Sequence, residues 1–193
     1  MVDAMLVVIG AIIALGALPC FPQTNELTSK ITDGWSQTRR TLLGLNIILL
    51  AGIMASTWTM IIKRDLVATG ASGSCTAAGC SALIGSHEWN TMPVIGLDWG
   101  LVGFIAFAAL GFLALSLFYE AGEGWVRRYV DMGFYASAAG LPFVAWLVAI
   151  ELFLADGAPV ICPFCTMAHI ATVLSFVIFL ALRRKHDAGE WAN

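Results

Sequence analysis

The sequence predicts an all-α integral membrane protein: a four-helix transmembrane bundle with one extra N-terminal transmembrane or interfacial helix. Of its 193 residues, 59% are apolar and 12% are charged, whereas soluble domains average about 45–50% and about 25%. Several apolar runs are close to the ~20 residues that a helix needs to cross a bilayer. The net charge of −3 offers no basic excess for binding phosphates, which excludes a nucleic-acid-binding protein.

The first apolar segment, residues 5–20, is the shortest, and it ends near the helix-stopping residues Pro19 and Pro22. It either spans the bilayer thinly or lies at its interface, and we expect a span. A secretory signal peptide would carry basic residues before its apolar run, but the only charged residue ahead of this one is Asp3. We therefore expect the segment to remain attached.

Four longer segments are rich in Leu, Ile, Phe, Ala and Gly and poor in charge, so each is predicted to span the membrane. They are residues 41–62, 94–119, 129–155 and 160–182. The spans divide the chain into an N-terminal helix and cytoplasmic loop (1–40), a four-helix core (41–182) that includes an outer loop (63–93), and a cytoplasmic tail (183–193).

The basic residues that flank the spans predict the orientation, because Lys and Arg are retained on the cytoplasmic side. With the C-terminus inside, only Lys63 and Arg64 lie outside. The other basic residues are Lys30, Arg39, Arg40, Arg127, Arg128, Arg183, Arg184 and Lys185. We therefore expect a multi-pass protein of the inner (cytoplasmic) membrane, with the outer loop and the short 156–159 turn on the periplasmic or extracytoplasmic side.

The cysteine pair Cys162 and Cys165, in Cys-Pro-Phe-Cys, opens the last span. A spacing of three residues puts both sulfurs on one face of a helix. The helix start concentrates unpaired N–H groups there and favours a thiolate. Two buried apolar cysteines or half of a zinc site are the alternatives. The internal Pro163 at an outward helix start favours a redox-active pair.

A second pair, Cys75 and Cys80, lies in the outer loop, and the four residues between them permit a loop disulfide. Taken alone, such a disulfide could be purely structural. Together, two cysteine pairs on the same side of the membrane predict a two-step thiol–disulfide relay. Zinc would need the C-x2-C spacing twice, so no metal site is expected. Cys20 lies at the opposite membrane face and is predicted to be an inert thiol.

Several of these motifs resemble the vitamin K epoxide reductase family, in particular bacterial members without a fused thioredoxin domain. Cys80 with the nearby Ser86 is similar to the loop motif of the family. The glycine-spaced stretch 96–103 resembles the start of its second core helix, and residues 161–166 resemble its redox-active helix. The resemblance covers residues 41–182.

The resemblance implies a thiol:quinone oxidoreductase with ubiquinone or menaquinone bound inside the helix bundle. It implies that Cys75 meets the thiols of a separate thioredoxin-fold (DsbA-like) protein and that Cys80 exchanges disulfides with Cys162. It further implies that Cys165 faces the quinone ring and that Ser86 positions the loop. The net result would be disulfide formation in exported proteins.

Three further residues, His169, Trp99 and Asp98, are candidates for binding the quinone. His169 lies one turn beyond Cys165 on the same helix face, where an imidazole can hydrogen-bond a carbonyl and pass on a proton. Trp99 stands where many family members have an asparagine; it could stack on the ring, although an interfacial aromatic belt is the leading interpretation. Asp98 and Glu151 lie near the outer interface, where a solvated or structural role is favoured over a functional one.

Other functional classes remain open from the sequence. A DsbB-type enzyme does the same work, but its C-x-x-C belongs near the end of its first span rather than at the start of the last. An accessory subunit of a larger membrane complex would use the cysteines for structure. A metal-handling membrane protein would bind metal stoichiometrically.

Overall fold

The computed structural model describes residues 4–20, 34–70, 78–93, 95–120 and 122–191. Over these residues the chain is helical, with no strand. The elements are α1 Ala4–Ala17, η1 Leu18–Cys20, α3 Gln37–Thr69, α4 Ala78–Leu83, α5 Trp99–Tyr119, α6 Val126–Ala149, η3 Ile150–Leu154 and α7 Pro163–Asp187. Four helices are long and apolar enough to cross a membrane: α3, α5, α6 extended by η3, and α7. The predicted all-α membrane class is confirmed.

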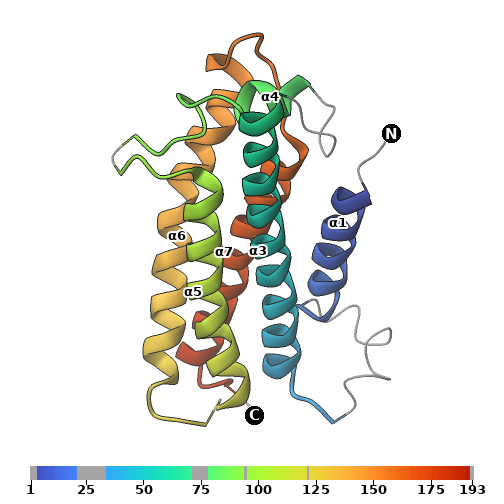
Figure 1. The fold of residues 1–193 in the computed structure, drawn as a ribbon. Helices are drawn as coiled ribbons and strands as arrows, with labels where there is room; N and C mark the ends of the chain where they lie inside the picture. Colours follow the sequence, from blue (N-terminus) through green and yellow to red (C-terminus); the bar gives the residue numbers. More distant parts are fainter. Residues whose placement is uncertain (1–3, 21–33, 71–77, 94, 121, 192–193) are drawn as a thin grey trace.

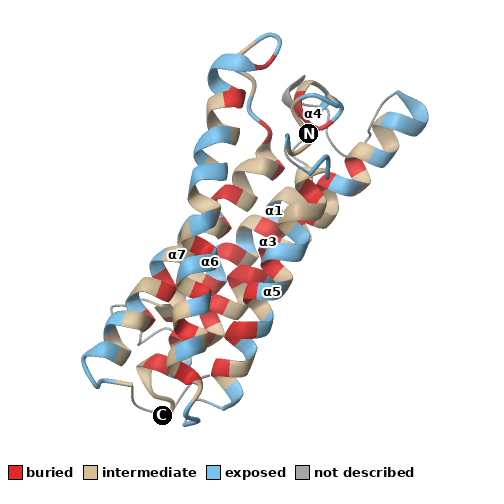
Figure 2. Cartoon of the chain, turned by 90° about the vertical axis from the view of Figure 1, so that its left-hand side faces the viewer, coloured by how far each residue is buried: buried red, intermediate tan, exposed pale blue. Residues whose placement is uncertain are grey.

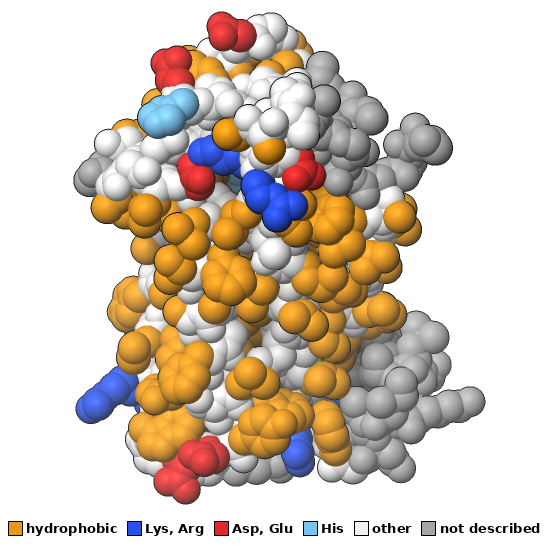
Figure 3. All heavy atoms as spheres, viewed as in Figure 1, with side chains coloured by type: hydrophobic (Ala, Val, Ile, Leu, Met, Phe, Trp, Pro, Cys, Tyr) orange, Lys and Arg blue, Asp and Glu red, His pale blue; other side chains and the backbone are white. Residues whose placement is uncertain are grey.

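The four long helices lie side by side as one bundle (Figure 1). Helix α3 packs against α5 and α7, and α6 packs against α7 and α5. Large apolar side chains, among them Phe112, Leu115 and Val177, point outward from the bundle. Figure 3 shows that apolar side chains cover the middle of one face, while most charged side chains gather toward its two ends. This distribution is typical of a surface in contact with lipid.

Helix α3 is longer at both ends than the predicted span 41–62. It begins after Ser36, whose hydroxyl oxygen accepts a hydrogen bond from the N–H of Arg39 at 3.3 Å. It ends at Gly70, which has the left-handed φ of 73° that favours glycine. Its 33 residues extend ~50 Å, well beyond the ~30 Å hydrocarbon core. Residues 63–69, which we expected in the outer loop, are therefore helical.

Helix α5 begins at Trp99, five residues later than the predicted 94, because the chain first makes a tight turn. Gly96 has φ 69°, and its N–H donates to the carbonyl of Met92 at 2.9 Å. The N–H of Met92 in turn donates to the carbonyl of Leu97 at 2.8 Å. Residue 94 itself lies outside the described residues. The turn delivers Asp98 to the N-cap position of α5.

Helix α1 lies alongside α3, outside the four-helix bundle (Figure 1). Its 14 residues give a length of ~21 Å. Gly16 and Gly44 let the two backbones touch: a Cβ built on Gly44 would lie 2.3 Å from the carbonyl oxygen of Gly16. The side chain of Gln37 also donates to the carbonyl of Pro19 at 3.2 Å. The N-terminal helix is thus held against α3 by close packing of small residues.

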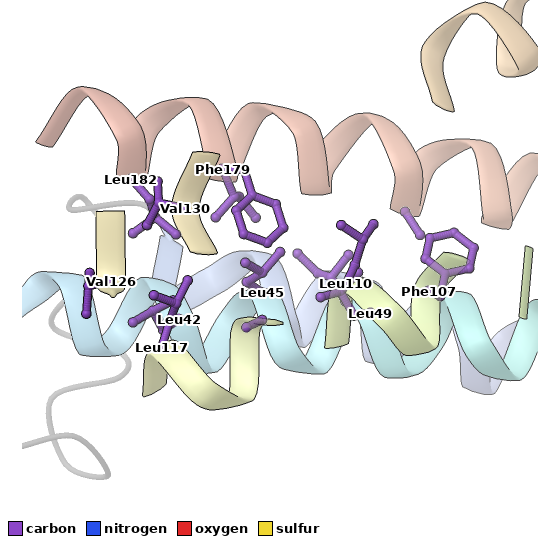
Figure 4. Close-up of a cluster of buried hydrophobic side chains, with 14 residues drawn as sticks. Leu42, Leu45, Leu49, Phe107, Leu110, Leu117, Val126, Val130, Phe179 and Leu182 are labelled. Atoms are coloured by element: carbon purple, nitrogen blue, oxygen red, sulfur yellow. The ribbon is translucent and has the colours of Figure 1, made fainter. Parts of the chain in front are cut away.

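The interior contains two clusters of buried apolar side chains. The larger one joins all four spanning helices and includes Leu45, Leu110, Val130 and Phe179 (Figure 4). The second cluster lies toward the other end of the bundle and includes Cys80 and Cys162. Figure 2 shows buried positions concentrated where the helices face one another. These two cysteines are therefore part of the buried interior.

Ion pairs tie the start of α6 to the end of α7. Asp131 pairs with Arg127 at 2.8 Å and with Arg183 at 2.9 Å. Arg127 also pairs with Asp187. Because α7 begins beside Cys162 and ends at Asp187, these charges lie at the end of the bundle opposite to that cysteine.

Candidate functional site

Cys162 and Cys165 lie at the start of α7, as predicted. Cys162 is the N-cap residue, with extended backbone angles (φ −92°, ψ 111°). Its sulfur accepts a hydrogen bond from the N–H of Cys165 at 3.3 Å. Pro163 occupies the first turn of the helix, where the missing N–H costs no hydrogen bond. Both thiols are free, and the Cys162 sulfur lies at the start of α7, where the first N–H groups of a helix have no partner within it.

Cys80 lies in α4, is 1% exposed and is disulfide-bonded. Cys75 lies outside the described residues. Cys80 and Cys162 belong to the same buried cluster, in which they pack with Ile84 and Phe164. The second loop cysteine and the first helix cysteine therefore lie at the same end of the bundle, in an environment from which water is excluded.

A cavity of about 280 Å³ opens between α3, α5, α6 and α7. Its wall is mostly apolar or small, and Cys165, His169, Trp99 and Asn90 all line it. The volume is near the lower end of the ~300–1,000 Å³ range of small-molecule pockets. One sulfur of the cysteine pair is thus on the wall of a compact apolar chamber.

His169 is the most informative polar group of this chamber. Its side chain lines the cavity, and the residue is 9% exposed. Its Nε2 atom is buried without a hydrogen-bond partner. A buried polar atom without a partner is costly, so the atom is suited to a hydrogen bond with a carbonyl oxygen placed in the cavity. Apolar walls with one such polar atom fit the head group of a quinone.

Trp99 is at the start of α5 and also lines the cavity. Its ring packs against Phe143 with the centroids 5.7 Å apart. Gly100 and Gly103 follow on α5 and bring it close to α3: a Cβ on Gly100 would lie 2.7 Å from the hydroxyl of Thr59. The glycine spacing noted in the sequence therefore permits close helix contact beside the chamber.

Asp98 and Ser86 lie outside the cavity wall. Asp98 forms an ion pair with Lys63, which joins the start of α5 to the far end of α3. The hydroxyl of Ser86 accepts a hydrogen bond from the N–H of Trp89 at 3.2 Å, and its carbonyl accepts from the N–H of Asn90 at 3.1 Å. Ser86 therefore orders the turn that brings Asn90 to the cavity.

Sequence reasoning missed Asn90. Residues 91–98, which form an irregular loop, separate Asn90 from Trp99. The backbone carbonyl of Asn90 nevertheless accepts a hydrogen bond from the N–H of Trp99 at 3.0 Å. Asn90 consequently lines the chamber together with Trp99, although position 99 itself is not an asparagine. The sequence signal was a polar residue shortly before a span, which is too common to single out without the turn geometry.

The family model described as the vitamin K epoxide reductase family matches residues 43–180 of the chain. No curated protein and no solved structure matched the chain.

Proposed function

The chain belongs to the vitamin K epoxide reductase family of membrane oxidoreductases, and on this premise we propose that it oxidises a thioredoxin-fold (DsbA-like) protein and reduces ubiquinone or menaquinone. One observation carries the proposal. Cys80 and Cys162 share a buried cluster, while Cys165 lies on the wall of the adjoining cavity. The cysteines that exchange disulfides in this proposal therefore lie next to a cavity for an electron acceptor.

In the proposed relay, a thiolate of the partner protein reduces a Cys75–Cys80 disulfide. The Cys80 thiolate then attacks a Cys162–Cys165 disulfide at Cys162, which forms a mixed disulfide and releases the Cys165 thiolate toward the cavity. Attack by Cys75 on Cys80 restores the loop disulfide and leaves the helix pair reduced.

A bound quinone would supply a two-electron acceptor that the side chains themselves lack. In the proposal, His169 and Asn90 hold its carbonyl oxygens, and Trp99 provides an apolar wall. The role of Ser86 is to order the turn before Asn90, and that of Asp98 is to hold the start of α5 through Lys63. Ser86 and Asp98 would thus act on the site indirectly.

We propose that the protein lies in the cytoplasmic membrane with the cysteine pairs on the extracytoplasmic side and the C-terminus inside. The end of the bundle opposite to Cys162 carries Arg127 and Arg183, in agreement with retention of basic residues in the cytoplasm. The cysteine end would then face the oxidising compartment and the partner protein.

The proposed exchange can be trapped. In the double variant Cys75→Ala/Cys165→Ala, neither resolving thiol remains, so we expect a Cys80–Cys162 disulfide to accumulate on mild oxidation. Mass spectrometry of a non-reduced digest would detect the linked peptides. The matched control, Cys75→Ala/Cys162→Ala, leaves Cys165 on the cavity side and should link to Cys80 far less. Equal linkage in both variants, or none in the first, would contradict the relay.

The replacement His169→Ala is expected to raise the KM for quinone and to slow turnover. Loss of a hydrogen bond of about 1.4 kcal/mol corresponds to a roughly tenfold effect. Steady-state quinone reduction with a reduced dithiol protein, followed by absorbance, measures both constants. His186→Ala, near the opposite end of α7, is the control and should behave as wild type. Unchanged kinetics in His169→Ala would remove this residue from the binding site.

A further inference from the structure

Glu151 is a buried carboxyl group at the end of the third span, and the relay described above does not use it. It lies in η3, a π-helical turn, and is 6% exposed. Its position near the outer interface favoured a solvated or structural role, but the structure buries it. π-Helical turns within longer helices are frequent at functional sites. The location of this carboxyl group therefore requires an explanation.

The carboxyl group of Glu151 is directed to the cysteine pair. It accepts a hydrogen bond from the backbone N–H of Cys162, and it is close enough to Cys165 for their charges to interact. The backbone carbonyl of Glu151 also accepts the N–H of Val160 at 2.8 Å, which anchors the segment leading into Cys162. The preceding residue, Ile150, belongs to the same buried cluster as Cys80 and Cys162.

Burial of a carboxylate is costly unless it is paired with an opposite charge. None of the ion pairs formed among the described residues includes Glu151. The titratable group that interacts with it electrostatically is the Cys165 thiol, and its other partner is the backbone of Cys162. A carboxyl group in this setting exchanges protons with its neighbours more readily than it forms a permanent ion pair.

We propose that Glu151 is the proton acceptor for the Cys162–Cys165 pair; this inference rests on the proposed function. Oxidation begins with Cys162 as the thiolate and Cys165 as the thiol. The Cys165 proton moves to the Glu151 carboxylate, the sulfur–sulfur bond forms, and two electrons pass to the quinone. The proton held by Glu151 then passes to one hydroquinone oxygen, and a proton from water reaches the other. Atoms and charges balance, and Glu151 returns to the carboxylate.

A purely structural role predicts a different behaviour. A carboxyl group that only caps the start of α7 can be replaced by a carboxamide, because glutamine keeps an oxygen that accepts the N–H of Cys162. Glutamine cannot take up a proton. Glu151→Gln therefore separates capping from proton transfer, and Glu151→Asp keeps a proton acceptor while shortening the side chain.

The first measurement is quinone reduction at saturating dithiol protein and quinone. Glu151→Gln is expected to lower kcat about 100-fold, in the range of general acid–base contributions, with the KM for quinone changed less than about twofold. Glu151→Asp should retain at least about a tenth of the wild-type kcat. Glu190→Gln, near the C-terminal end of the described chain, is the control and should match wild type. A wild-type kcat in Glu151→Gln, or an aspartate variant as slow as the glutamine variant, would overturn the inference.

The second measurement needs no quinone turnover. In the reduced, quinone-free protein at mildly alkaline pH, alkylation of the Cys162–Cys165 pair by iodoacetamide is followed by mass spectrometry. We expect it to be several-fold faster in Glu151→Gln, because no negative charge then opposes the thiolate. Equal rates would contradict direct coupling. If the wild-type protein shows no cysteine-dependent quinone reduction, the proposed function fails, and the alkylation rates still decide whether Glu151 acts on the thiols.

Discussion

Cys162→Ala and Cys165→Ala are each expected to reduce quinone reduction to the rate seen without protein. Every step of the relay needs a thiolate aligned with a disulfide, and α7 with its N-cap residue contains no cysteine besides Cys162 and Cys165. The fold should survive, because alanine leaves the apolar packing of Cys162 with Phe164 and Ile84 largely in place. Loss of the sulfur that caps α7 should cost about 1 kcal/mol.

The assay combines purified protein, a reduced dithiol protein and quinone, with circular dichroism to confirm helical content. Cys20→Ala is the matched control, because Cys20 is also a free thiol but contacts the carbonyls of Gly16 and Thr41 beside α1. It should retain wild-type activity. Full activity in either Cys162→Ala or Cys165→Ala would refute the proposed function.

Gly133→Ala is expected to destabilise the bundle by about 3 kcal/mol, at the upper end of the usual cost of overpacking. Gly133 lies on α6 against α7, and a Cβ there would be 2.2 Å from the ring of Phe179. The ring cannot simply move aside, because Phe179 is fully buried in the larger apolar cluster with Val130 and Leu45. The two helices must therefore separate or shift.

Thermal unfolding in detergent, followed by circular dichroism, measures this effect. Gly111→Ala on α5 is the control, because a Cβ there meets nothing within 4 Å. It should change the stability by less than about 0.5 kcal/mol. Equal stabilities of the two variants would show that the close contact of α6 with α7 at Gly133 is not needed.

The membrane class, the four spans and the start of α7 follow from the sequence alone. Spans depend on local hydropathy over ~20 residues. The start of α7 is signalled by Pro163, which suits the first turn of a helix, after the capping residue Cys162. The predicted ends of the spans were less accurate where a helix continues beyond its apolar residues. Helix α3 continues through the charged Lys63 and Arg64 because only Gly70 ends it.

The tertiary structure decided which residues meet. Hydropathy cannot separate a lipid-facing residue from one that faces another helix, since both are apolar. It therefore revealed neither the cavity beside Cys165 nor the contact of Gly133 with Phe179. The carboxyl group of Glu151 and the turn that carries Asn90 become neighbours of the site only when separate segments fold together. The sequence determined the kind of chemistry, because the cysteine pairs are motifs of a few neighbouring residues. The packing of the helices decided which side chains surround the cysteines, because those contacts join positions far apart in the chain.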